Sequence, residues 1–229
     1  MLYKATTHPA MLMYLDNHIS AGPNSQHVRW ARSRNEQAGL NDNLGRELLE
    51  LHTVSPDVNY TETDIRNAAK VLAGWGMDVQ GNSPQNLLEQ AGTINHWDMY
   101  KKNWAEPGSK VVLGKTIYQG KQGLKQLTDF LATHDHTINH LSFKLAEHFV
   151  RDDPQQADID YISNAWRQGN GSMEKIHTAV IERAIDSKEP KFQWPMNWLF
   201  QVIRLTDARY FKGWSEVDTY LNRTMETRR

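Results

Sequence analysis

The chain has 229 residues, enough for one sizeable domain or two small ones with a real hydrophobic core. Its 26 basic and 27 acidic residues give a formal net charge of -1, so the overall charge provides no basic face for nucleic acid or an anionic membrane. The lack of cysteine excludes disulfide bonds, thiolate zinc sites and cysteine nucleophiles. We therefore expect no nucleic-acid partner and no thiol chemistry.

The hydropathy of the chain argues against a membrane protein. No window reaches the roughly 18 apolar residues of a membrane-spanning helix, and the first residues lack the apolar run of a signal peptide. The sequence thus predicts a soluble chain without a membrane span. Its compartment stays open, because a lack of cysteine fits both the cytoplasm and an exported protein.

The N-terminal part is predicted to contain a short helix, a turn and a basic loop. His8 begins a helix-entry pattern, the helix ends near Asp16, and residues 22–25 are a strong turn signal. Residues 26–38 then carry three arginines around Trp30. Such a basic and aromatic cluster can hold a phosphate, but in a chain with as many acids it is more often a solvated loop.

The stretch 39–75 is predicted to form two amphipathic helices joined by a tight connector. The first follows Asn41 or Asp42, whose side-chain oxygens can accept an unpaired amide hydrogen. Residues 61–64 fit the capping-box pattern for the second, which ends at Gly74. Apolar residues at helical spacing give the two helices their buried stripes. These residues are Leu44, Leu48 and Leu51 in the first helix, and Ile65, Ala68, Ala69 and Leu72 in the second.

The polar side of the first helix holds the main candidates for chemistry. Arg46 and Glu50 lie four residues apart, within contact range, and Glu47 lies on the same side. Carboxylates with imidazoles can act as acid and base or bind a divalent metal. The catalytic candidates are Glu47, Glu50, His52 and His8, and the metal candidates are His8, Asp16, Glu47 and Glu50.

Helix geometry disfavours a self-contained metal site on this helix. His52 projects roughly 160° away from Glu50. In carboxylate-bridged metal pairs the Glu and His lie three residues apart, whereas here they are two apart. A structural Arg–Glu network with His52 as a hydrogen-bonded packing residue is the favoured alternative. A divalent metal would need further ligands from elsewhere in the chain.

Glycine and proline recur through residues 76–121, which are predicted to form a long irregular loop insertion. The run Lys110–Gly114 is its one good strand candidate, paired in a short hairpin with Trp97–Tyr100. Functional loops and packed surface insertions both fit such a stretch. From Gly123 onward helical periodicity returns in several segments, including one that begins at Pro195.

Six or more amphipathic helices against one strand pair predict a mainly α-helical fold. We expect a single multi-helix domain over residues 1–229, with the irregular segment 76–121 inserted in it and a short β-hairpin.

Several polar or aromatic side chains in the predicted helices and turns are not needed for packing. The candidates for binding a ligand or partner are Asn24, Asn41, Asn43, Arg46 and Trp75.

Several short motifs follow one another in an order that is specific for one family. They include His8-Pro9-Ala10-Met11, Gly22-Pro23-Asn24, Arg46-Glu47-Leu48-Leu49-Glu50-Leu51-His52-Thr53, Gly74-Trp75, Asp152-Asp153-Pro154 and Gly213-Trp214. From residue 8 nearly to its end, the chain resembles the large bacterial family catalogued as domain of unknown function 1800. The resemblance implies a mostly helical bacterial protein with no established reaction, of which this chain would be the C-terminal part.

The chain departs from that family's pattern in two places. Similar proteins usually carry a long N-terminal helical region before the His-Pro motif, and this chain begins almost at the motif. The family also tends to have a histidine before the turn that here is Glu106-Pro107-Gly108, where this chain has Ala105. A site that uses that histidine is therefore not expected. Genes of the family commonly neighbour those of a family with exported members, which points to export of full-length relatives.

Two functions from different classes follow from these observations. The first is a binding or assembly module that works with a protein partner or by self-association, because a chain without its family's N-terminal portion should expose apolar surface. The second is a metal-dependent or acid–base hydrolase that uses Glu47 and Glu50 with nearby His or Asp. Whether the chain is an enzyme stays open.

Overall fold

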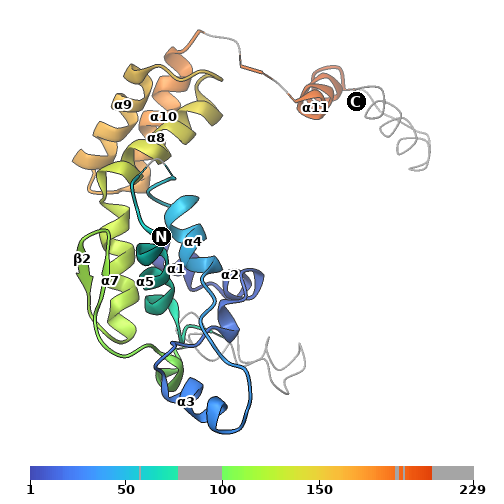
Figure 1. Ribbon diagram of the computed structural model, residues 1–229. Coiled ribbons are helices and arrows are strands. Elements are labelled where there is room, and N and C mark those ends of the chain that lie inside the picture. The colour runs from blue at the N-terminus through green and yellow to red at the C-terminus, as the bar shows by residue number, and fades with distance from the viewer. Residues whose placement is uncertain (57, 77–99, 189–190, 193, 208–229) are drawn as a thin grey trace, which may run out of the picture. The chain divides into compact units, whose positions relative to one another are not determined.

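The computed structural model describes residues 1–56, 58–76, 100–188, 191–192 and 194–207 (Figure 1). The described residues form helices and one short antiparallel hairpin, so the prediction of a mainly α-helical fold is confirmed. The chain divides into two units, residues 1–188 and 189–229. The single domain that we expect over the whole chain stays a prediction, because most of the second unit lies outside the described residues.

The elements of the first unit follow one another in the order α1 (Leu2–Thr6), α2 (Pro9–Tyr14), η1 (Asn17–Ile19), α3 (Gln26–Ser33), α4 (Asn43–Glu50), α5 (Glu62–Leu72), η3 (Lys102–Trp104), β1 (Lys110–Val112), β2 (Lys115–Ile117), α7 (Lys121–Ala132), α8 (Asp135–Phe149), α9 (Gln156–Gln168) and α10 (Met173–Asp186). In the second unit α11 (Pro195–Leu205) begins at the predicted proline. Within the described ranges, no helix combines the length and the hydropathy that crossing a membrane requires.

Helices α4 and α5 pack against each other at the centre of the larger hydrophobic core. Leu44 and Leu72 are fully buried there. The helices approach closely at Gly45, where an added β-carbon would lie 2.7 Å from the backbone nitrogen of Ala69. The predicted stripes are confirmed except at Leu51, which is 62% exposed because α4 ends before it.

Helix α5 begins and ends as the sequence predicts. The hydroxyl of Thr61 accepts a hydrogen bond from the N–H of Asp64 (3.2 Å), and the Asp64 carboxylate accepts one from the N–H of Thr61 (2.9 Å). This reciprocal pair confirms the capping box. Gly74 follows the helix with a φ of +90°, which favours glycine. The turn leads into Trp75, which is fully buried.

The hairpin closes on itself and packs against α5. Strand β1 pairs antiparallel with β2, and Val111 lies opposite Thr116. Leu113 and Gly114 connect the strands with φ values of 49° and 74°, the conformation that two-residue hairpin turns require. The prediction of a short hairpin is therefore confirmed.

The partner that the structure gives this strand is β2, whereas we predicted Trp97–Tyr100. Of the segment Trp97–Tyr100 only Tyr100 is described, and it forms an isolated bridge with Trp75 rather than pairing with β1. A two-residue turn closes with less loss of chain entropy than a distant pairing, so the local partner is preferred. Residues 77–99 of the predicted irregular segment lie outside the described residues.

Helices α8, α9 and α10 lie side by side and share a second, smaller core (Figure 1). The carboxylate of Asp158, fully buried near the start of α9, joins them. It accepts hydrogen bonds from Nε of Arg183 (2.7 Å) and from the N–H of Gln155 (3.0 Å), and it lies 3.0 Å from Nε of Arg151. Two guanidinium groups thus compensate one buried negative charge.

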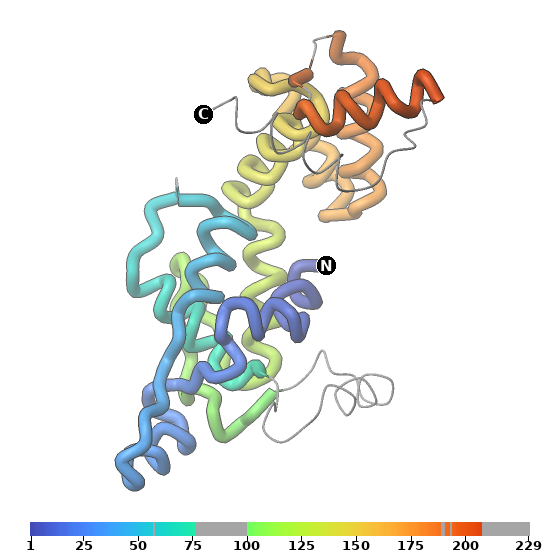
Figure 2. The backbone as a smooth tube through the Cα atoms, turned by 90° about the vertical axis from the view of Figure 1, so that its right-hand side faces the viewer, coloured from blue at the N-terminus to red at the C-terminus, as the bar shows by residue number. Residues whose placement is uncertain are grey.

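Helix α3 lies at one end of the first unit, flanked by chain without helix or strand (Figures 1 and 2). Residues 20–25 lead into it, and residues 35–42 lead from it to α4. Val28 and Ala31 are buried, whereas Trp30 is 46% exposed. The helix therefore packs by one side and presents an aromatic side chain at the surface.

Candidate functional site

Two segments without regular structure and the short helix η3 are joined beside α3 by backbone hydrogen bonds. The N–H of Ala21 donates to the carbonyl oxygen of Gly39 (2.8 Å). The next residue, Gly22, donates its N–H to the carbonyl oxygen of Trp104 (2.8 Å). Because buried backbone groups need partners, these bonds favour one arrangement of the three segments.

Asn17 links the same region to the end of α5. Its Nδ2 donates to the carbonyl oxygens of Leu72 (3.2 Å) and Trp75 (2.7 Å). The residue is 1% exposed, so water cannot replace these partners. The side chain of Asn17 therefore holds η1 against the turn that follows α5.

The buried carboxylate of Glu106 joins two turns of the chain. Its Oε2 accepts a hydrogen bond from the backbone N–H of Asn24 (2.8 Å), and its Oε1 accepts one from Nδ2 of the same residue (2.7 Å). A β-carbon on Gly22 would lie 2.5 Å from the Cα of Glu106, so the two turns approach closely only with glycine there. Nζ of Lys110 donates to the carbonyl oxygens of Glu106 and Gly108, and burial lowers the pKa of this lysine.

This framework brings aromatic side chains from distant parts of the sequence together. The ring of His27 lies parallel to the indole of Trp104, with centroids 3.8 Å apart and planes 10° apart. Trp30, one helical turn further along α3, lies 6.1 Å from His27 at 28°. The guanidinium of Arg34 lies 4.2 Å from the ring centroid of Trp30, and Nζ of Lys101 lies 4.6 Å from that of Trp104. We call these five residues the aromatic row.

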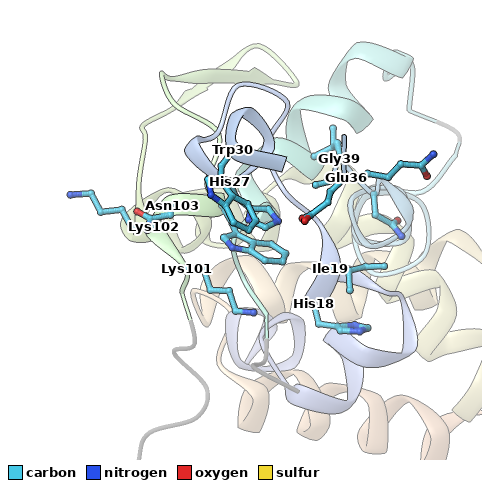
Figure 3. Close-up of a pocket in the computed structure, with 14 residues that line it drawn as sticks. His18, Ile19, His27, Trp30, Glu36, Gly39, Lys101, Lys102 and Asn103 are labelled. Atoms are coloured by element: carbon cyan, nitrogen blue, oxygen red, sulfur yellow. The ribbon is translucent and has the colours of Figure 1, made fainter. Parts of the chain in front are cut away.

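The rings of the aromatic row line an open cleft of about 1570 Å³ (Figure 3). The rest of the lining comes from His18 and Ile19 of η1, from residues 36–41, and from Lys102 and Asn103 of η3. This volume exceeds the roughly 300–1,000 Å³ of pockets that enclose small ligands. The cleft is therefore large and open enough for an extended ligand.

The surroundings of His27 favour the neutral form of its imidazole. Burial lowers its pKa, the charge of Lys101 lowers the pKa further, and Glu36 acts in the opposite direction. A neutral ring stacks on the indole of Trp104 without adding a third positive charge to the row.

Two of the predicted binding residues belong to this region. Asn41 lines the cleft, and its backbone N–H donates to the hydroxyl of Ser20 (3.0 Å). Asn24 is engaged by Glu106 and has a structural role in the framework. Asn43 is exposed at the start of α4, and its N–H donates to Oδ1 of Asn41 (2.9 Å).

Trp75, also a predicted binding residue, belongs to the hydrophobic core. Its indole is fully buried. Tyr3 meets it edge-on with ring centroids 5.8 Å apart, and Tyr100 lies 5.2 Å away on a tilted plane. A ligand could reach the indole only if the core opened.

Arg46 is the centre of an ionic network on the polar side of α4. Its Nη1 lies 3.4 Å from Oε1 of Glu50, as the four-residue spacing predicts. Its Nη2 lies 3.1 Å from both carboxylate oxygens of Glu62 and 3.8 Å from Asp42. Burial and a hydrogen bond to Glu50 raise the pKa of Tyr60 to about 12. The network joins α4 to α5 and to the connector between them.

The other catalytic and metal candidates lie elsewhere on the first unit. His8 is exposed, and its Nδ1 accepts the N–H of Ala10 (3.1 Å) as the cap of α2. Asp16 is exposed with a φ of 55°. His52 is half-buried, and burial lowers its pKa against the opposing charge of Glu47. Among the described residues, no three His, Asp or Glu side chains are grouped to hold a metal ion, and the metal hypothesis stays a prediction.

Sequence reasoning missed the two residues at the centre of the site, His27 and Trp104. No spacing rule connects them, because they lie in separate segments of the chain. The available signals were Trp30 among the arginines and the two turn motifs 22–24 and 106–108, which the structure joins.

These observations define a mainly helical protein with an aromatic-lined cleft held by buried turns. The chain belongs to the family described as "Protein of unknown function (DUF1800)", whose model matches residues 1–227. The resemblance that the sequence motifs carry is thereby confirmed. No curated protein and no solved structure matches the chain.

Proposed function

We propose that this chain is a binding or assembly module that takes a protein partner in the cleft beside the aromatic row. The aromatic row carries the proposal. Tryptophan and arginine are enriched among the residues that contribute most to protein interfaces. Here Trp30 is 46% exposed and lies beneath the guanidinium of Arg34.

The support around the row favours binding without a large entropic cost. His27 and Trp104 stack on each other, and Trp104 is joined through its carbonyl to the buried residue Gly22. Side chains that are ordered before a partner arrives lose little conformational freedom on association. A preformed wall of this kind suits recognition.

A metal-dependent or acid–base hydrolase has less support as the function. Glu50 is paired with Arg46 and accepts a hydrogen bond from Tyr60. Neither Glu47 nor Glu50 lines the aromatic cleft. The aromatic cleft, rather than the carboxylates of Glu47 and Glu50, is therefore the site of the proposed function.

A photo-crosslinking residue at position 103 tests the proposal. It replaces Asn103, which lines the cleft, in cells that produce the chain from their own genome. We expect one crosslinked protein species, either another protein or a second copy of this chain, and we expect Trp30→Ala to abolish it. The matched control places the same crosslinker at Gln122, exposed on α7. Equal products at both positions, or products that persist in Trp30→Ala, would contradict a binding cleft.

A further inference from the structure

We propose that the segment of the partner that occupies the cleft is an acidic peptide, bound in extended conformation along residues 36–41. The inference rests on the proposed function and names the chemistry of the partner. Three observations carry it: the local charge, two cations that form no ion pair in the described residues (Lys102 in the cleft lining and Arg34 over the ring of Trp30), and the part of the lining backbone that makes no backbone hydrogen bond.

The charge of the chain is unevenly distributed. Residues 26–36 and 101–104 contain five cations and one acid, a formal charge of +4. Since the formal net charge of the whole chain is -1, the remaining residues have a formal charge of -5. A positive region on an otherwise acidic protein attracts and orients a negatively charged partner. The five cations are Arg29, Arg32, Arg34, Lys101 and Lys102.

Two of these cations are available to a ligand. Lys102 lines the cleft, and Arg34 lies over the ring of Trp30. Within the part of the chain that the structure describes, neither side chain forms an ion pair. A carboxylate of a ligand can therefore meet either cation without displacing an existing partner.

The backbone that lines the cleft favours a peptide over other polyanions. In the run 36–41, the N–H of Glu36 donates to Ala31, the carbonyl of Gly39 accepts from Ala21, and both backbone groups of Asn41 bond to the hydroxyl of Ser20. In the described residues, Gln37, Ala38 and Leu40 make no backbone hydrogen bond. A peptide of about six residues in extended conformation spans roughly 20 Å, and its amides can pair with the backbone groups that have no backbone partner. A glycan or a nucleic acid lacks the alternating N–H and C=O groups of a peptide backbone that such pairing uses.

Fluorescently labelled peptides of about eight residues, long enough to cover the run, test this directly. The first alternates glutamate and leucine, the second replaces each glutamate by glutamine, and the third is the acidic peptide with alternate backbone amides N-methylated. A sulfated glycan and a single-stranded oligonucleotide serve as other polyanions. Fluorescence anisotropy measures the Kd of each probe at low and at physiological salt.

We expect the acidic peptide to bind with a Kd in the micromolar range. The glutamine peptide and the N-methylated peptide should each bind at least about tenfold more weakly, because they lose the charges or the backbone pairing. The variant Arg34→Gln with Lys102→Gln should weaken the acidic peptide about fivefold to tenfold, the loss of two exposed ion pairs. The matched control Arg66→Gln with Lys115→Gln removes two exposed cations of the same unit outside the cleft lining and should leave the Kd unchanged.

Three results would overturn the inference. Equal binding of the glutamine peptide removes the acidic requirement, and tighter binding of the glycan or oligonucleotide makes the cleft a general polyanion site. No binding of the acidic peptide at millimolar concentration excludes it as the occupant. In each case a crosslink at position 103 that Trp30→Ala abolishes would still support the binding module, so the two proposals fail separately.

Discussion

The imidazole of His27 lies parallel to the indole of Trp104 with their ring centroids 3.8 Å apart, although the two residues come from distant parts of the chain. The contact depends on two turns that are joined through the carboxylate of Glu106 and both N–H groups of Asn24. Buried polar contacts therefore set the geometry of the cleft. They can be tested by single substitutions.

Glu106→Gln should destabilise the first unit by about 1–3 kcal/mol. The side chain of glutamine has a carbonyl oxygen that accepts and an NH2 group that donates. One of the two N–H groups of Asn24 would therefore face the NH2 group instead of an acceptor. Urea unfolding measures the change in the free energy of unfolding. Asp129→Asn, which breaks the exposed ion pair with Lys125, is the control and should cost less than about 1 kcal/mol. Equal costs for the two variants would contradict the role of Glu106.

Asp158→Asn should be among the most destabilising changes in the helices α8 to α10. It leaves the guanidinium groups of Arg151 and Arg183 without their buried carboxylate, a loss of about 3 kcal/mol or more. Asp135→Asn, at a carboxylate that is 79% exposed and pairs with Arg167, should cost less than about 1 kcal/mol. Chemical denaturation of both variants separates the buried pair from the surface pair.

Acid should destabilise the protein through three histidines. Burial is the largest cause that lowers the pKa of His27, His52 and His134 in the folded state. The unfolded chain then binds more protons between those lowered values and the ordinary histidine pKa of about 6.5. The contribution of these histidines to the free energy of unfolding is therefore fully present above about pH 6.5. It is lost as the pH decreases through their folded-state pKa values.

Urea unfolding between about pH 7.5 and about pH 5.5 measures this dependence. Replacing all three histidines by glutamine should flatten it, whereas His177→Gln, at an exposed position, should leave it unchanged. A triple variant with the slope of the unmodified protein would show that other groups are responsible.

Glu50→Gln should lower the pKa of Tyr60 from about 12 toward its ordinary value of about 10. Burial and the hydrogen bond to the Glu50 carboxylate both disfavour the tyrosinate, and the substitution removes the negative charge. Alkaline absorbance titration, with Tyr60→Phe subtracted, reports this one phenol. Glu47→Gln serves as the control and should leave the pKa of Tyr60 unchanged. The same pKa of Tyr60 in both variants would contradict the hydrogen bond between Tyr60 and Glu50.

Gly45→Ala should separate α4 from α5. Alanine has the better helix propensity by about 1 kcal/mol, so the change would stabilise an isolated helix. Here its methyl group would lie 2.7 Å from the backbone nitrogen of Ala69, and overpacking of this kind costs about 1–3 kcal/mol. A lowered midpoint of urea unfolding, beside an unchanged midpoint for Asn43→Ala on the exposed side of α4, would support the close approach. A raised midpoint would contradict it.

Local features were accessible from the sequence because they depend on residues a few positions apart. The capping box of Thr61 and Asp64, the end of α5 near Gly74 and the ion pair of Arg46 with Glu50 all follow from short-range spacing. The same reasoning predicted the fold class, since helical periodicity repeats within each segment. It did not identify β2 as the partner of β1.

Only the tertiary structure decided where the cleft lies and which side chains form it. His27 meets Trp104, and Asn24 meets Glu106, because several buried backbone groups are satisfied together when those segments adopt one arrangement. Trp75, which looked like a binding residue, is buried instead because the turn after α5 leads into the core. A hydrogen bond between distant segments depends on the whole packed chain, and no local pattern of residues encodes it.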